Sequence, residues 1–255
     1  MNSTLATSTA WLLPAWPDAP VNVRALSTRR HGGVSAGEYA SFNLAQHVGD
    51  DPDAVAANRA ILRRTAALPS EPLWLEQVHG IDVVEHSGEV TAAAPPRADA
   101  AVAFEPGRVC VVMTADCLPV VLVDRAGTRV GVAHAGWRGL VGGVLEATIA
   151  ALRCMPSQLV AWLGPAIAQG AFEVGAEVRS AFVEKDAANG AAFVPNANDR
   201  FQADLYVLAR NTLARAGVRS VSGGGHCTSA EPEQFYSFRR DCGRTGRMAT
   251  LAWLA

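Results

Sequence analysis

Apolar and polar positions follow strand-like and helix-like spacings in turn along the chain. Residues 21–26 alternate between apolar and polar side chains, which predicts a half-buried strand, and Gly32-Gly33 after it predicts a turn. Asp51 or Asp53 is suited to cap a helix that runs to about Leu68, just before a proline. The first quarter of the chain is therefore expected to contain one strand and one helix.

The middle of the chain is dominated by apolar, β-branched runs that predict a sheet. Six strands are expected, at residues 73–77, 81–85, 100–104, 109–114, 119–124 and 129–135. After a turn at 136–139, helices are expected at 140–152, near 174–185 and at 201–216, with short strands near Leu159, near Val218 and at 248–254. This interleaving predicts an α/β or α+β fold. Because no repeat or linker interrupts it, residues 1–255 are expected to form a single domain.

The fifth and sixth of these strands are expected to pair as a hairpin. Ala126 and Gly127 would occupy the centre of the turn. In that register Cys117 lies opposite Gly136, so Cys117 and His134 become diagonal neighbours on one face, about 7 Å apart at the backbone. A slip of one residue would turn the two side chains to opposite faces.

The composition is that of a globular protein, with 49% hydrophobic and 18% charged residues. The 22 basic and 24 acidic residues nearly cancel and form no long run of one sign, which argues against nucleic-acid binding. No apolar stretch approaches the roughly 18 residues of a membrane helix. The apolar run at 11–13 lacks a preceding basic residue and is followed by prolines, so a cytoplasmic location is expected. Five scattered cysteines favour reduced thiols.

Two histidines and one cysteine are the candidate metal ligands. His79 lies in Gln-Val-His-Gly at 77–80, Cys117 in Thr-Ala-Asp-Cys-Leu-Pro at 114–119, and His134 in His-Ala-Gly-Trp-Arg-Gly at 134–139. This donor set suits a borderline-soft cation such as zinc. A buried core cysteine and two turn histidines are the alternative, and no tight motif such as Cys-x-x-Cys favours the metal.

Together these segments resemble the laccase-domain or multicopper polyphenol oxidoreductase-like family, now associated with purine nucleoside phosphorylase activity and also described as peptidoglycan editing factors. The other matching residues are 28–29, 32–35, 43–44, 47–51, 58–59, 164–167, 227–228, 237, 239–240 and 245–249. The resemblance implies a layered αββα-type sandwich with mixed sheets covered by helices, similar to putative cysteine hydrolases. It also implies that His79, Cys117 and His134 bind the metal.

The activity implied by the resemblance is phosphorolysis of adenosine, inosine and methylthioadenosine, together with deamination of adenosine. The expected partners are a purine nucleoside and inorganic phosphate, and the expected cofactor is zinc, with copper as the alternative. Cys117, Asp116 and Arg138 are the expected catalytic residues. Asp116 would carry a proton or simply cap a turn, and Arg138, beside a predicted helix start, would hold phosphate or pair with a surface acid.

Four further residues in the family-like segments are expected to contact the substrate. Arg59 or Arg29 would help Arg138 to position the phosphate. Asn43 and Gln77 complete the predicted substrate-binding set.

Three other functions remain open. A copper oxidase could use the same three ligands with Met113 as an axial ligand, but six histidines without a His-x-His pair are too few for several coppers. A structural zinc site would need His226 or Cys227 as its fourth ligand. A peptidoglycan-precursor hydrolase would use Cys117 as a nucleophile. The sequence leaves the oligomeric state open.

Overall fold

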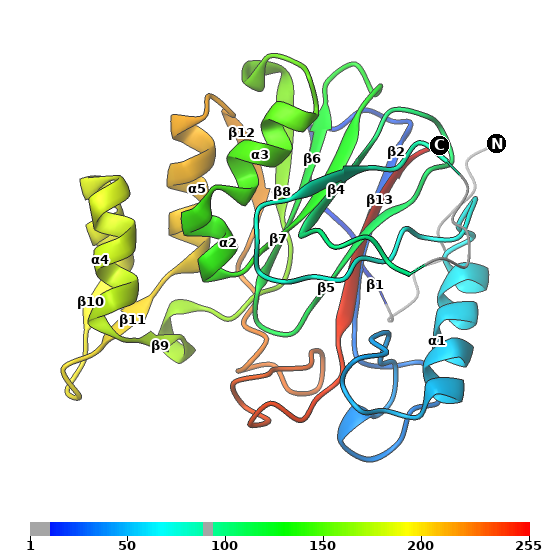
Figure 1. The fold of residues 1–255 in the computed structure, drawn as a ribbon, viewed down its shortest axis with the longest axis horizontal. Coiled ribbons are helices and arrows are strands. Elements are labelled where there is room, and N and C mark those ends of the chain that lie inside the picture. Colours follow the sequence, from blue (N-terminus) through cyan, green and yellow to red (C-terminus); the bar gives the residue numbers. More distant parts are fainter. Residues whose placement is uncertain (1–10, 89–93) are drawn as a thin grey trace.

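Two β-sheets lie face to face at the centre of the fold. The computed structural model describes residues 11–88 and 94–255 (Figure 1). The first sheet is antiparallel and contains, in order, β1 (Trp11–Leu12), β2 (Val23–Thr28), β13 (Met248–Leu254) and β5 (Cys110–Thr114). Small apolar side chains from both sheets fill the space between them, including Ala25, Val112, Val121, Val132 and Ala252.

The second sheet is mixed and has six strands. Its order is β12 (Ser220–Gly223), β8 (Leu159–Leu163), β6 (Leu118–Asp124), β7 (Val130–Ala135), β4 (Ala100–Ala103) and β3 (Val83–Glu85). The two outer pairs, β12 with β8 and β3 with β4, are parallel. A third, antiparallel sheet, which the sequence did not predict, joins β10 (Phe193–Pro195), β11 (Phe201–Ala203) and β9 (Glu173–Val174).

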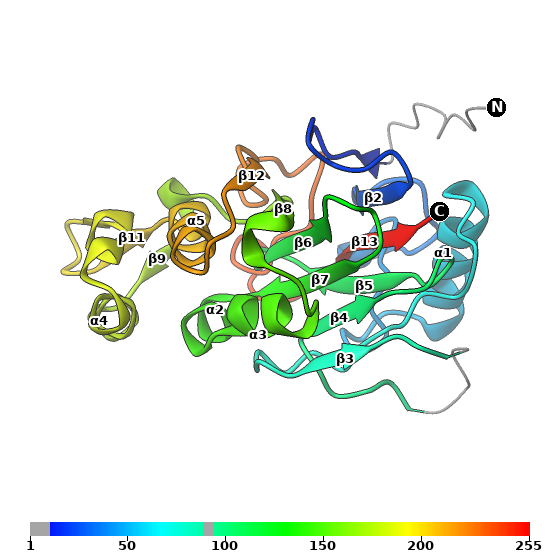
Figure 2. The same ribbon diagram turned by 90° about the horizontal axis from the view of Figure 1, so that it is seen from above.

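Helices cover the outer faces of the two central sheets. On the six-stranded sheet lie α2 (Trp137–Gly142), α3 (Val144–Ala151) and α5 (Leu205–Arg215), and on the four-stranded sheet lies α1 (Pro52–Thr65). The fifth α-helix of the described residues, α4 (Ala176–Lys185), packs beside the third sheet, at the opposite end of the molecule from α1 (Figures 1 and 2). Short 3₁₀ helices occupy Gly37–Tyr39, Pro156–Gln158, Gln169–Ala171 and Ala187–Ala192.

The predicted mixed α/β fold is confirmed, and so is the register of the central hairpin. Leu118 pairs with Ala135 and Pro119 with His134, which places Cys117 opposite Gly136. Every residue of β5, β6 and β7 is buried because both faces of these strands are covered. That double burial explains why the sequence shows continuous apolar runs here instead of alternation.

Two predicted helices differ in the structure. The helix expected at 140–152 is two helices, because Gly143 between them has a φ of +111°, a left-handed conformation that breaks the helical path. The first of them, α2, begins at Trp137, inside the predicted turn at 136–139. The helix expected at 201–216 begins with strand β11, and α5 starts only after Asp204, whose side chain caps it by accepting the Val207 N–H.

The strand predicted at 73–77 is reduced to isolated bridges at Leu73 and Glu76. The other strands shift by a few residues at most, and β13 has the predicted bounds. Asp51 is the N-cap of α1, because its side chain accepts the Asp53 N–H. Within residues 11–88 and 94–255, no helix has both the length and the hydropathy that crossing a membrane requires.

Candidate metal centre and its pocket

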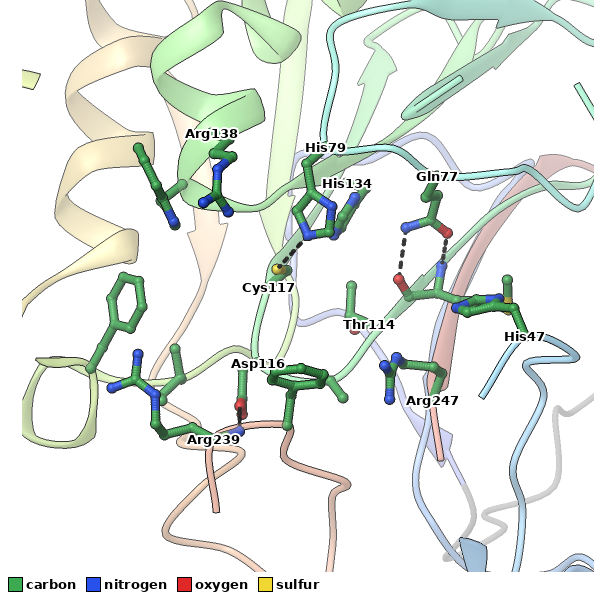
Figure 3. A pocket seen from close by; sticks show the side chains of 16 residues that line it. His47, Gln77, His79, Thr114, Asp116, Cys117, His134, Arg138, Arg239 and Arg247 are labelled. Atoms are coloured by element: carbon green, nitrogen blue, oxygen red, sulfur yellow. Dashed lines mark hydrogen bonds between the residues drawn. The ribbon is translucent and has the colours of Figure 1, made fainter. Parts of the chain in front are cut away.

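Three potential metal ligands from separate segments meet at one end of the central sheets (Figure 3). His134 is the fifth residue of β7, Cys117 directly precedes β6, and His79 comes from the irregular segment before β3. Their ligand atoms all lie within 4.8 Å of one another, and the Cys117 Sγ is 3.9 Å from the His79 Nε2. The predicted ligand set is therefore brought together by the fold.

Asp99, which the sequence analysis missed, orients both histidines. The Nδ1 of His134 is 2.8 Å from the Asp99 Oδ1, which leaves the Nε2 of His134 available to a metal. The same carboxylate accepts the backbone N–H groups of Val78, His79 and Gly80 at 3.1, 2.9 and 2.6 Å. Asp99 is completely buried, so it holds the 78–80 turn and the His134 ring in one fixed arrangement. A lone acid just before an apolar strand was its only sequence signal.

Cys117 and His134 form a charged pair in the absence of metal. Burial opposes the ionisation of the thiol, but the nearby His134 charge and hydrogen bonds from both histidines outweigh it and lower the pKa of Cys117 to about 6. Burial also opposes the charge on His134, yet Cys117 and Asp99 raise its pKa to about 9. The thiol is thus poised as a thiolate, the form that binds metals.

The chemistry and packing of the three side chains fit a metal ion. One thiolate and two imidazoles match zinc, and also copper. Space behind them is closed by Gly136, where an added Cβ would lie 2.9 Å from the Cys117 Sγ and 3.1 Å from the His79 Cδ2. A side chain at position 136 would therefore push two of the ligands apart.

A structural zinc site would need His226 or Cys227 as a fourth ligand, and neither residue belongs to the ligand group. Only His79, Cys117 and His134 belong to it within residues 11–88 and 94–255. His226 contacts Glu231 at 3.1 Å, and the Cys227 Sγ accepts the N–H of Ala168 at 3.4 Å. The three-ligand group instead faces a cavity of about 450 Å³.

Three arginines line this cavity, of which the sequence analysis chose only Arg138. Figure 3 places Arg138 and Arg239 on one side of the three ligands, and Arg247 with His47 on the other. The Arg247 Nη1 is anchored by the carbonyls of Thr245 and Gly246. No carboxylate pairs with any of these arginines in the described part of the chain. The cavity is therefore suited to an anion.

Apolar side chains also line the cavity, from Trp137, Ile167, Phe172 and Phe238. The arginines lie over the aromatic rings of this set, Arg138 at 4.6 Å from the Trp137 centroid and Arg239 at 5.5 Å from that of Phe172. Phe238 is 52% exposed, an unusual state for a large apolar ring, and the Arg247 Cζ lies 5.5 Å from its centroid. Phe238, Arg239 and Arg247 all come from the irregular segment between β12 and β13. That segment has no periodicity, so the pattern of apolar positions gave no sign of its place in the pocket.

Gln77, predicted to bind substrate, and Asp116, predicted to be catalytic, both line the cavity, but their polar atoms are bonded within the protein. The Gln77 amide donates to the Met113 carbonyl at 2.8 Å and accepts the Met113 N–H at 2.7 Å. It thereby completes the edge of β5 in the way a neighbouring strand would. Asp116 accepts three hydrogen bonds from the segment between β12 and β13.

The remaining predicted substrate residues lie outside the set that lines the cavity. Asn43 is buried and bonds to Ala45 and Asp50. Arg59 donates to the Leu44 carbonyl, and its guanidinium lies 3.8 Å from the centroid of the Trp74 ring. Arg29 is also not among the lining residues. Arg239 and Arg247 stand where the prediction expected Arg29 or Arg59.

Comparison with known proteins finds close relatives over nearly the whole chain. The family model described as multi-copper polyphenol oxidoreductase laccase matches residues 24–255. A protein of Escherichia coli (strain K12) named purine nucleoside phosphorylase YfiH is 53% identical over 243 residues, covering 95% of this chain and 98% of the relative. Purine nucleoside phosphorylase PA4543 of Pseudomonas aeruginosa is 54% identical over 246 residues, covering 96% and 98%.

Solved structures share the fold. Protein NMB0706 of Neisseria meningitidis has a TM-score of 0.89 at 49% sequence identity, covering 96% of this chain and 99% of that one. YlmD of Geobacillus stearothermophilus has a TM-score of 0.90 at 30% identity, covering 98% and 97%.

Replacing Asp99 by Asn is expected to weaken zinc binding about 10- to 100-fold, because an amide N–H₂ group would replace one of the two oxygens that accept hydrogen bonds here. Competition between the metal-free protein and a chromophoric zinc chelator measures the effect. Asp82→Asn is the matched control, since Asp82 is an exposed acid near the same turn. Wild-type zinc affinity in a folded Asp99→Asn variant would contradict the orienting role.

Alkylation of Cys117 in the metal-free protein is expected to rise through an inflection near pH 6, where the thiolate forms. Iodoacetamide labelling followed by mass spectrometry measures the rate. The Cys117→Ser variant gives the labelling of the other four cysteines, which is subtracted from that of the wild type. In His134→Gln the inflection is expected at higher pH, because the stabilising imidazolium is lost. An inflection at about 8.5 in the wild type, as in a free thiol, would disprove the charged pair.

Proposed function

The chain belongs to the family of the multi-copper polyphenol oxidoreductase laccase model, and on that premise we propose that it is a zinc-dependent purine nucleoside phosphorylase. Relatives of that name are 53% and 54% identical to it over nearly their full lengths. The observation that carries the proposal is the combination, in one cavity, of a His-Cys-His ligand group and three arginines without carboxylate partners in the described residues. A phosphorylase needs such a cavity because one of its two substrates is an anion.

In phosphorolysis a phosphate oxygen forms a bond to C1′ of the ribose while the bond from C1′ to the purine breaks. The electron pair of that bond and a proton pass to the departing base. We assign phosphate binding to Arg138, Arg239 and Arg247, which would fix its position and its charge. Arg239 is already restrained, because its Nη1 donates to the Glu173 carbonyl at 3.0 Å. Restraint of this kind lowers the entropic cost of holding the anion.

The aromatic side chains of the cavity suit the purine. Phe238 is an exposed ring in the cavity lining, and Phe172 is a second aromatic ring of the same lining. Purines stack on aromatic faces, and burial of such surface contributes most of the affinity for a flat, weakly polar ligand. Adenosine, inosine and methylthioadenosine share this ring system, so we propose all three as substrates.

The metal-binding role is assigned to His79, Cys117 and His134. When these residues hold a zinc ion, it supplies Lewis acidity that polarises a substrate oxygen. Asp99 keeps the His134 ring in the tautomer that such binding requires. Deamination of adenosine is proposed as a second reaction of the same cavity.

A multicopper oxidase is less well supported. Several copper ions need several sets of imidazole ligands, whereas the described residues bring together one group, of two histidines and one cysteine. Met113 lines the cavity, but no further histidine joins the group in this part of the chain.

Zinc-loaded protein incubated with adenosine is expected to release adenine and ribose 1-phosphate only when phosphate is present, and to form inosine by deamination without it. Chromatography of the products separates the two reactions. His79→Ala is expected to lose both, because one metal ligand is gone, whereas His31→Gln, outside the cavity, should retain them. Absence of adenine and inosine under all conditions would eliminate the nucleoside proposal.

Replacing Arg138, Arg239 or Arg247 singly by Gln is expected to raise the KM for phosphate by about tenfold or more, because a charge-assisted contact is lost. Steady-state kinetics at varied phosphate measures it. Arg59→Gln is the control from outside the cavity and should leave this KM within about threefold of the wild type. If Arg59→Gln raised the KM and the cavity arginines did not, phosphate would bind elsewhere.

A further inference from the structure

Asp116 lines the cavity and contacts two other segments of the chain. Its peptide bond leads directly to the ligand Cys117, and its backbone carbonyl accepts the N–H of Ile167 at 2.9 Å. Its carboxylate accepts the Thr228 hydroxyl at 2.6 Å, the Ser237 hydroxyl at 3.0 Å and the Arg239 backbone N–H at 2.6 Å. Asp116 thus joins the ligand Cys117 to the segment at Ile167 and to the segment between β12 and β13.

The carboxylate of Asp116 is occupied by these contacts. Only 8% of the residue is exposed, and two of its three donors share the Oδ2 atom. The Ser237 hydroxyl already accepts the Arg240 N–H at 3.1 Å, so its own proton is directed to Asp116. The backbone N–H of Arg239 can only donate. Three of the roughly four acceptor positions of the carboxylate are therefore used by the segment between β12 and β13.

The backbone at Asp116 is held in a rare conformation for this purpose. Its φ of +89° lies in the left-handed region, which a residue with a side chain rarely adopts. The strain is maintained because the reversed backbone lets the carboxylate reach Thr228 and Ser237 while Cys117 faces the histidines. Sharp turns of this type recur at functional sites.

The segment reached by Asp116 is organised from within by Arg240. That guanidinium donates to the carbonyls of Thr228 and Phe235 at 2.8 and 3.0 Å, and it pairs with Asp241 at 2.8 Å. These bonds shape the segment but do not attach it to the ligand group. The bonds to the residue beside Cys117 are those made by Asp116, at Ser237 and at the Arg239 N–H, on either side of the lining residue Phe238.

From this geometry we infer that Asp116 is a positioning residue, not a proton carrier. It fixes Phe238 and Arg239 relative to the strand end that carries Cys117, so that purine and phosphate are held in register with the ligand group. This inference rests on the proposed function for its kinetic consequences. The positioning of the segment itself can be measured without any activity.

The test compares Asp116→Asn with two variants that leave Asp116 intact. Ser237→Ala and Thr228→Val each remove one hydroxyl that donates to the Asp116 carboxylate. All three are expected to raise the KM for adenosine or phosphate, Asp116→Asn by about tenfold or more and the donor variants less, with kcat within about threefold of wild type and zinc content unchanged. Hydrogen exchange of the amides at 235–243 is expected to accelerate in the same order.

A fall in kcat of about 100-fold in Asp116→Asn, with unchanged KM, unchanged exchange at 235–243 and no effect of Ser237→Ala, would overturn the inference in favour of a proton carrier. If the protein proved to have no phosphorylase activity, accelerated exchange in the three variants would still support the positioning role. Normal exchange in all three would refute it. Ser237→Ala provides a mild variant if Asp116→Asn does not fold.

Discussion

The candidate site depends on one buried carboxylate. Asp99 bonds to the ring of His134 and to three successive backbone amides of the turn that carries His79. That turn belongs to no helix or strand, so these bonds replace the regular hydrogen bonding that would otherwise hold it. Burial opposes the negative charge, but the His134 hydrogen bond and the amides outweigh it and lower the pKa of Asp99. The charge of Asp99 in turn supports the charge on His134.

Around this centre the pocket is built from two kinds of structure. The ligands Cys117 and His134 are presented by neighbouring strands whose two faces are both packed, which leaves them little freedom. The arginines and Phe238 come largely from an irregular segment, held by side-chain bonds to Asp116 and Arg240. A ligand group carried by packed strands thus faces residues of an irregular segment, and binding residues are often found on loops that a sheet scaffold positions.

Several residues at the edge of the site use their polar groups for the scaffold. Gln77 completes the free edge of β5, and Asn43 organises the turn beside Asp50. These bonds show that Gln77 and Asn43 help to hold the pocket in shape. Arg59 is similar, because stacking on Trp74 and a bond to Leu44 account for its position.

The sequence by itself determined the contacts that are local in the chain. The short turn at Ala126-Gly127 between two apolar runs fixed the register that joins Cys117 to His134, and the Asp51 cap fixed the start of α1. Only the tertiary structure decided that His79 joins them through Asp99, that Gly143 divides a helix, and that Arg239 and Arg247 line the cavity while Arg59 does not. These contacts bridge distant segments, and no periodic pattern encodes them, because an irregular segment takes its conformation from the side chains it meets after folding.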